Sequence, residues 1–260
     1  MPSPTGRTPP DGRLAVIASL AVLTILAWVY VVHVAQAPGM SKDLMDMPGM
    51  DMAGMVMPME PTLLALFAMW VAMMMGMMLP SVLPNVLLFY AISRQRRGSG
   101  RAPVSVTAFV GGYLVAWIGF SLLAALVQTR LRLGLLPLAS QSRPAAIAAG
   151  LVLLLTGIYQ WTRFKVACLS HCRSPVAHFS AHWREGTRGA LRMGLGHGLY
   201  CLGCCWLLMA LLFVGGVMNT YWIAGLALLV LLEKVVPHGD LLGRLAGAGL
   251  AAWGLLLIVR

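Results

Sequence analysis

Residues 192–214 read RMGLGHGLYCLGCCWLLMALLFV, an apolar stretch long enough to cross a lipid bilayer as a helix. It contains His197, Cys201, Cys204 and Cys205, which do nothing to help a helix pack against lipid. At about 100° per residue, the four side chains share one helix face, within an arc of about 100°. Thiols and an imidazole on one face at membrane depth predict a functional site.

The composition of the whole chain agrees with a membrane location. Of its 260 residues, 59% are hydrophobic and 10% are charged, and the mean hydropathy is +0.82. Soluble domains carry about 25% charged residues. Because backbone in contact with lipid must satisfy its own hydrogen bonds, we expect an all-α, polytopic transmembrane helix bundle in contact with the lipid bilayer. The net charge is +11, but the basic residues lie in short turns between apolar segments. They form no nucleic-acid-binding motif, so no nucleic-acid partner is expected.

About seven apolar segments are long enough to be considered as spans. They are residues 14–35, 62–91, 104–128, 144–165, 192–214, 217–236 and 241–259. Arg7 and Arg13 precede the first segment, and most other basic residues then fall in loops on the same side. The positive-inside rule therefore predicts an N-in, C-out orientation, in a multi-pass protein of the plasma (inner) membrane.

The pattern divides the chain into two regions. Residues 1–61 are expected to form an N-terminal anchor helix and a Met-rich external loop, and residues 62–260 the membrane bundle with the Cys/His motifs. Ala35-Gln36-Ala37 resembles a signal-peptide cleavage site. The apolar run before it is longer than that of a usual signal peptide, which favours an uncleaved anchor.

Methionine is concentrated in the external loop and in the second segment. The chain has 18 methionines. Those in the loop follow Met-x-Met and Met-x-x-Met spacings, and the candidate ligands are Met47, Met50, Met52 and Met55. Thioethers are soft, neutral ligands that select Cu(I), so we expect the loop to collect copper. The alternative is a flexible linker or a membrane-surface loop that uses Met as apolar filler. Met73 and Met77 are further candidates, although Met at helical spacing usually serves packing.

The five cysteines form two clusters, and neither lies in a stretch assigned to the outside. The first is the face of 192–214, and the second comprises Cys168, His171 and Cys172, which also share one face if helical. Both suit a soft metal ion. Two other interpretations remain open: small buried hydrophobes, or a redox pair at the dithiol spacing of Cys201 and Cys204.

A few charged residues lie close to these clusters in sequence. Lys165 and Arg173 flank the second cluster and would favour its thiolates. Glu233 and Lys234 lie near the end of the sixth segment, where partial burial would favour pairing them or neutralising one; a helix-end anchor is the commoner role.

Three strings together resemble the predicted metal-binding integral membrane proteins grouped as domain of unknown function 2182. They are MWVAMMMGMMLPS (69–81), KVACLSHCRSP (165–175) and HGLYCLGCCW (197–206); Met218-Asn219 and Glu233-Lys234 also fit its pattern. The resemblance covers about residues 62–236. It implies metal binding and says little about mechanism.

The sequence therefore favours a membrane protein that handles a soft metal, Cu(I) first and zinc well behind, in transport, delivery or homeostasis. A metallochaperone or a membrane enzyme is a possible partner. The alternatives are a membrane thiol-disulfide oxidoreductase and a metal-holding subunit of a membrane enzyme complex. No nucleotide-binding or phosphorylation motif indicates a pump, and an enzymatic activity of the chain itself is not expected.

Overall fold

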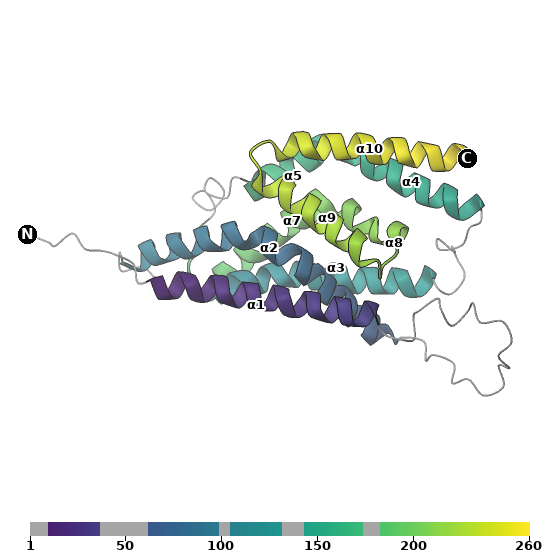
Figure 1. Ribbon diagram of the computed structural model, residues 1–260. Helices are drawn as coiled ribbons and strands as arrows, with labels where there is room; N and C mark the ends of the chain where they lie inside the picture. Colours follow the sequence, from purple (N-terminus) through teal and green to yellow (C-terminus); the bar gives the residue numbers. More distant parts are fainter. Residues whose placement is uncertain (1–9, 37–61, 99–104, 132–142, 174–182) are drawn as a thin grey trace, which may run out of the picture.

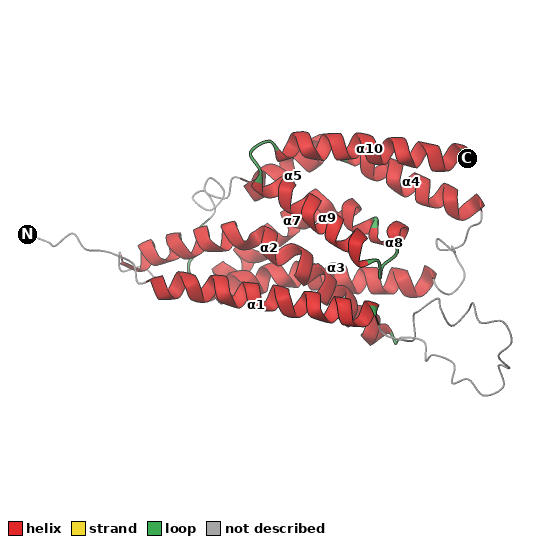
Figure 2. Cartoon of the chain, viewed as in Figure 1, coloured by secondary structure: helices red, strands yellow, loops and turns green. Residues whose placement is uncertain are grey.

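The computed structural model describes residues 10–36, 62–98, 105–131, 143–173 and 183–260, and throughout these ranges the regular structure is helical (Figures 1 and 2). The helices are α1 (Pro10–Ala35), α2 (Leu63–Gly98), α3 (Val106–Arg130), α4 (Arg143–Tyr159), α5 (Arg163–Arg173), α7 (Gly186–Ala210), α8 (Leu212–Gly215), α9 (Thr220–Val235) and α10 (Gly239–Val259). The predicted all-α bundle is confirmed.

Five helical segments are long and apolar enough to cross a membrane. They are Gly12–Ala35, Leu63–Arg96, Val106–Arg130, Gly186–Gly215 and Gly239–Val259. Large apolar side chains such as Ile25, Leu123 and Leu256 remain exposed on them, as helices that contact lipid require. The segment predicted at 217–236 is the 16-residue helix α9, which is shorter than the other five. Seven spans and the N-in, C-out orientation stay predictions.

The segment predicted as one helix over 144–165 is broken. Helix α4 ends at Tyr159, α5 begins at Arg163, and the two are bent by 63°. The hydroxyl of Thr162 accepts a hydrogen bond from the backbone N–H of Lys165 at 3.3 Å, so Thr162 caps the new helix. Hydropathy alone does not reveal such a break, because both arms are apolar enough to form a single span together.

Glycines allow α3 and α7 to pack with their backbones in contact. A Cβ atom on Gly194 would overlap the carbonyl oxygen of Phe109, and one on Gly112 would overlap that of Leu191. This close approach is typical of small residues at membrane helix interfaces. It holds the cysteine-bearing helix α7 against α3, while α5 packs on α7 and α2 packs on both α3 and α9.

Helix α2 contains two prolines, and another helix satisfies the carbonyl that the first of them leaves free. Pro80 has no N–H to donate to Gly76, four residues earlier. The indole N–H of Trp28 on α1 donates to that carbonyl at 3.2 Å. A Cβ atom on Gly76 would lie 3.3 Å from the Trp28 Nε1 atom, so the absence of a side chain there lets α1 approach α2 closely.

Candidate metal centre

The four candidate residues of α7 lie on one buried face, as their spacing predicts. His197, Cys201, Cys204 and Cys205 are each at most 2% exposed. The opposite face of the same turns is exposed, at Leu199, Tyr200 and Trp206. The lipid-compatible side chains therefore point outward, and the metal-binding types point into the bundle.

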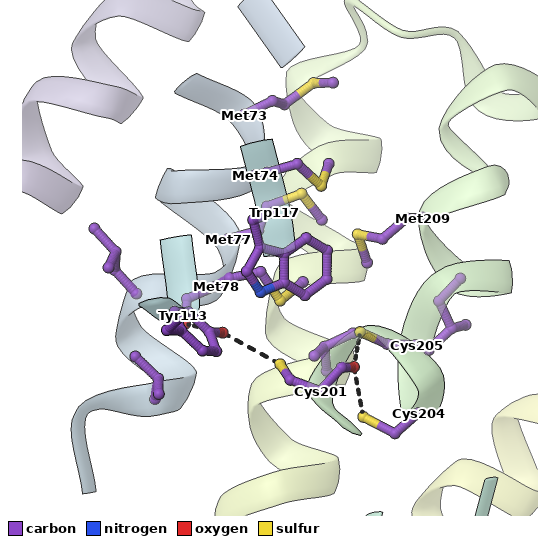
Figure 3. Close-up of a cluster of buried hydrophobic side chains, with 14 of the residues drawn as sticks. Met73, Met74, Met77, Met78, Tyr113, Trp117, Cys201, Cys204, Cys205 and Met209 are labelled. Atoms are coloured by element: carbon purple, nitrogen blue, oxygen red, sulfur yellow. Dashed lines mark hydrogen bonds between the residues drawn. The ribbon is translucent and has the colours of Figure 1, made fainter. Parts of the chain in front are cut away.

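The four side chains do not converge on one point. The Sγ atoms of Cys204 and Cys205 each donate to the carbonyl oxygen of Cys201 at 3.0 Å (Figure 3). The Nε2 atom of His197 lies 3.0 Å from the Nδ2 atom of Asn85 on α2. Within the described ranges, no group of three or more His, Cys, Asp or Glu side chains is arranged to hold a metal ion. Binding of one metal ion by several of these side chains would therefore require them to rotate.

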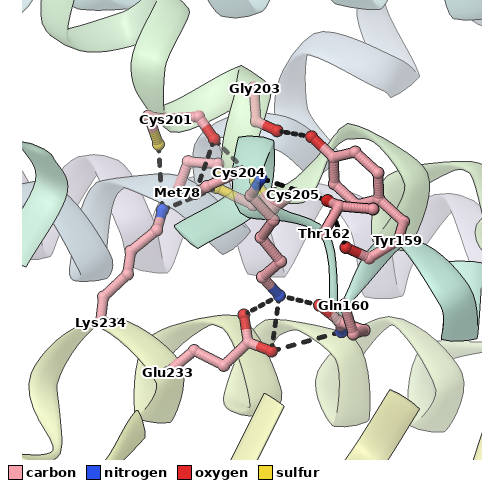
Figure 4. Close-up of polar contacts among 11 residues, drawn as sticks. Met78, Tyr159, Gln160, Thr162, Cys201, Gly203, Cys204, Cys205, Glu233 and Lys234 are labelled. Atoms are coloured by element: carbon pink, nitrogen blue, oxygen red, sulfur yellow. Dashed lines mark hydrogen bonds and ion pairs between the residues drawn. The ribbon is translucent and has the colours of Figure 1, made fainter. Parts of the chain in front are cut away.

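Cys201 has polar partners from two other helices. Its Sγ atom lies 3.0 Å from the Nζ atom of Lys234 on α9 and 3.2 Å from the hydroxyl of Tyr113 on α3 (Figures 3 and 4). Lys234 also reaches the hydroxyl of Ser81 at 3.1 Å and the Sδ atom of Met78 at 3.9 Å. A sulfur that faces an ammonium and a hydroxyl is placed to act as an acceptor.

The fold joins the two cysteine clusters of the sequence. Cys168 and Cys172 on α5 are buried, and the Cys172 thiol interacts with the thiols of Cys201 and Cys204. His171 is separated from them: its ring stacks on Tyr200 with centroids 4.2 Å apart, and its Nδ1 atom lies 2.8 Å from the carbonyl oxygen of Ala167. We call Cys172, Cys201, Cys204 and Cys205 the thiol cluster.

The charged residues are paired differently from the sequence prediction. Lys165 binds Glu233, with 2.7 Å between Nζ and Oε2. Arg173 donates to the carbonyl oxygen of Val236 at 2.8 Å. Lys165 and Arg173 thus have other partners, and the cation that contacts a cysteine sulfur in the described ranges is Lys234. An effect of Lys165 and Arg173 on the thiolates of the second cluster stays a prediction. Glu233 and Lys234 do not pair, because consecutive residues on a helix point about 100° apart.

Methionines of α2 extend the set of sulfur atoms from the thiol cluster toward the other end of the helix. Met73, Met77 and Met78 are each 1% exposed and lie in one cluster with Trp117 and Met209 (Figure 3). Burial against aromatic rings also serves packing, so their position is consistent with both interpretations of the sequence. The loop candidates Met47, Met50, Met52 and Met55 lie outside the described residues.

All five cysteines are free and buried. The interior therefore offers thiols and thioethers side by side, with no carboxylate among them in the described ranges. Glu233 is held by Lys165 and Gln160. Soft sulfur ligands of this kind select Cu(I) over Mg²⁺ or Ca²⁺.

Comparison with known families decides the assignment. The sequence profile described as PpoB2, copper chaperone, matches residues 67–257. The chain belongs to this copper chaperone family. The match spans α2 to α10 and so contains every described cysteine and buried methionine of the site. It confirms the expected association with copper. The description of the profile does not mention domain of unknown function 2182. Comparison with curated proteins and with solved structures gives no significant match.

Three buried residues that contact the candidate site were not identified from the sequence. Asn85 and Tyr113 have polar side chains within apolar segments, and a polar side chain at such a position indicates a functional role. Lys234 was recognised only as a member of a charged pair. Their contacts with His197 and Cys201 depend on helix packing, which sequence spacing does not reveal.

Proposed function

We propose that the protein is a membrane-embedded copper chaperone that carries Cu(I) as cargo in its thiol cluster. The family links the chain to copper, and the burial of thiols beside thioethers supports Cu(I) as the oxidation state. Cys201 would be the central ligand, because the thiols of Cys172 and Cys204 interact with it. His197 is a further candidate ligand once it leaves Asn85.

The observation that carries this proposal is the meeting of α5 and α7. Cys172 and Cys201 are 29 positions apart in the numbering, yet their thiols interact inside the bundle. A structural role for buried cysteine does not need such a gathering, since a small apolar residue fills the same space. Two thiolates are sufficient to hold Cu(I), which accepts low coordination numbers.

The remaining features of the sequence fit a route through the membrane. The Met-rich loop would collect Cu(I) outside, and Met73 and Met77 would pass it inward toward Cys201. A metallochaperone or a membrane enzyme would supply or receive it. The five long apolar helices support an integral membrane protein, and we propose the plasma membrane as its location.

Anaerobic competition with a chromophoric Cu(I) chelator tests the proposal on the full-length protein in detergent micelles. The wild type is expected to retain Cu(I), and Cys201→Ser to lose at least about tenfold in affinity because a hydroxyl is a hard ligand. Ser121→Ala is the control, since Ser121 is buried and its hydroxyl donates to the carbonyl oxygen of Trp117 on its own helix. A wild type that retains no Cu(I), or a Cys201→Ser variant that matches it, would refute the proposal.

The oxidoreductase alternative makes a different prediction for the same protein. It requires a reversible disulfide between Cys201 and Cys204, visible by mass spectrometry after mild oxidation, and an activity that survives deletion of residues 40–59. The Cys204 thiol donates to the Cys201 carbonyl oxygen, so a disulfide would first require it to rotate. Detection of that disulfide without Cu(I) retention would favour the alternative.

A further inference from the structure

A cavity of about 320 Å³ lies between α2, α5 and α9, next to the thiol cluster. Its rim includes Pro84 and Val235, which are exposed. Its floor includes Asn85, Cys172 and Lys234, of which none is more than 9% exposed. The cavity therefore connects the surface of the bundle to two residues of the site, Cys172 and Lys234, the second of which contacts the Cys201 sulfur.

The cavity is positively charged. Arg173 and Lys234 line it, and no carboxylate lines it within the described part of the chain. Asp240 lies 3.5 Å from the Nη1 atom of Arg173 and offsets part of that charge, but the Arg173 side chain is 22% exposed and Asp240 is not part of the lining. The Lys234 ammonium is buried beside the floor. A cavity with two cations and few compensating charges favours an anionic ligand.

Hydrogen bonds of Asn85 fix the position of the cavity floor. The Nδ2 atom of Asn85 donates to the carbonyl oxygen of Cys172 at 3.3 Å and lies 3.0 Å from His197. The end of α5 is thereby tied to α2 and α7. Cys172 lines the cavity and interacts with Cys201, which does not line it, so an incoming ion would meet Cys172 first.

We propose that this cavity is the mouth through which Cu(I) is exchanged, and that it takes Cu(I) carried by small anionic thiolates. The proposal rests on the proposed function. Cu(I) bound by two thiolates bears a negative charge, which suits Arg173 and Lys234, and a ligand of cysteine size fits the volume. In the exchange, a Cu–S bond to Cys172 forms as the bond to the carrier sulfur breaks. Copper stays Cu(I), and the departing thiolate takes the proton that Cys172 gives up.

Two carriers of similar size and opposite charge test the proposal. Cu(I) is supplied to the full-length protein as its 3-mercaptopropionate or its cysteamine complex, and the rates of transfer are compared. The measured ratio is the transfer rate from the mercaptopropionate complex divided by the rate from the cysteamine complex. We expect Arg173→Gln to lower this ratio by about fivefold relative to the wild type, because it removes a cation that attracts the anionic carrier. Arg173→Lys should keep most of the ratio, because it keeps the charge.

Arg163→Gln is the matched control, since Arg163 is an exposed cation on the same helix outside the cavity. An unchanged ratio in Arg173→Gln, or an equal fall in Arg163→Gln, would overturn the proposal, because the preference would then come from the overall positive charge. If the protein retains Cu(I) at equilibrium but Arg173→Gln leaves the rate ratio unchanged, only the proposed role of the cavity is refuted. No retention of Cu(I) from either carrier would refute the proposed function as well.

Discussion

The Nζ atom of Lys234 on α9 lies 3.0 Å from the Sγ atom of Cys201 on α7. Both groups are buried, and the hydroxyl of Tyr113 approaches the same sulfur from α3. Two helices thus place polar groups at a cysteine that a third helix carries. Buried polar groups are costly unless they are partnered, so this contact also ties the three helices together at the site.

The neighbouring ion pair gives a prediction about stability. Lys165 and Glu233 have side chains 3% and 1% exposed. Glu233→Gln should lower the free energy of unfolding by about 3 kcal/mol, because it leaves the Lys165 ammonium buried without its counter-ion. The double variant Lys165→Met/Glu233→Met should recover most of that loss. Thermal unfolding in detergent measures both, and a double variant less stable than Glu233→Gln would contradict the argument.

A second prediction concerns the contact between α3 and α7. Gly194→Ala should destabilise the protein by about 2 kcal/mol or more, since its methyl group would overlap the backbone of Phe109 and force the helices apart. Gly196→Ala is the matched control on the same helix, because a Cβ atom there meets nothing within 4 Å. We expect Gly196→Ala to unfold at or above the wild-type temperature. Equal melting temperatures for the two variants would show that the helices do not meet as described.

The methionines of α2 provide a third prediction. Met73→Leu/Met77→Leu should slow delivery of Cu(I) to the thiol cluster by about tenfold, because leucine keeps the volume and removes the thioether. Met75→Leu is the control, since Met75 is only partly buried and lies on another face of α2. Transfer rates measured anaerobically decide between them. If the two variants transfer copper at the same rate, the buried methionines serve packing only.

Asn85 allows a fourth prediction. Asn85→Ala removes the contacts with His197 and with the Cys172 carbonyl. We expect Cu(I) affinity to fall by about tenfold, because losing the contact that holds the end of α5 beside α7 outweighs the release of His197 as a ligand. Chelator competition measures the affinity, with Thr129→Ala as the control, since the Thr129 hydroxyl donates to the carbonyl oxygen of Ala125 on its own helix. An unchanged affinity would mean that α5 is positioned by other contacts.

The orientation of the chain yields a fifth prediction. Because basic residues accumulate in the loops assigned to the inside, a reporter fused after Arg260 should lie outside the cytoplasm. A phosphatase that folds only outside should be active there, and a fluorescent protein that folds only inside should be dark. The opposite pattern would reverse the proposed direction from the Met-rich loop to the cavity.

Several properties follow from the sequence alone. Long apolar segments are sufficient to predict a helical bundle, because lipid leaves the backbone no other partner over such lengths. Helical periodicity likewise places His197, Cys201, Cys204 and Cys205 on one face. Soft sulfur ligands then point to copper, which the family match supports.

Tertiary packing decided what the local sequence could not. The break before Arg163 turns α5 back onto α7, so that Cys172 meets Cys201 and the two sequence clusters become one. Packing also decides the partners of the charged residues: Lys165 binds Glu233, and Lys234 contacts the Cys201 sulfur. The physical reason is that periodicity describes a single helix, whereas which faces meet depends on glycine contacts and a capped bend between helices.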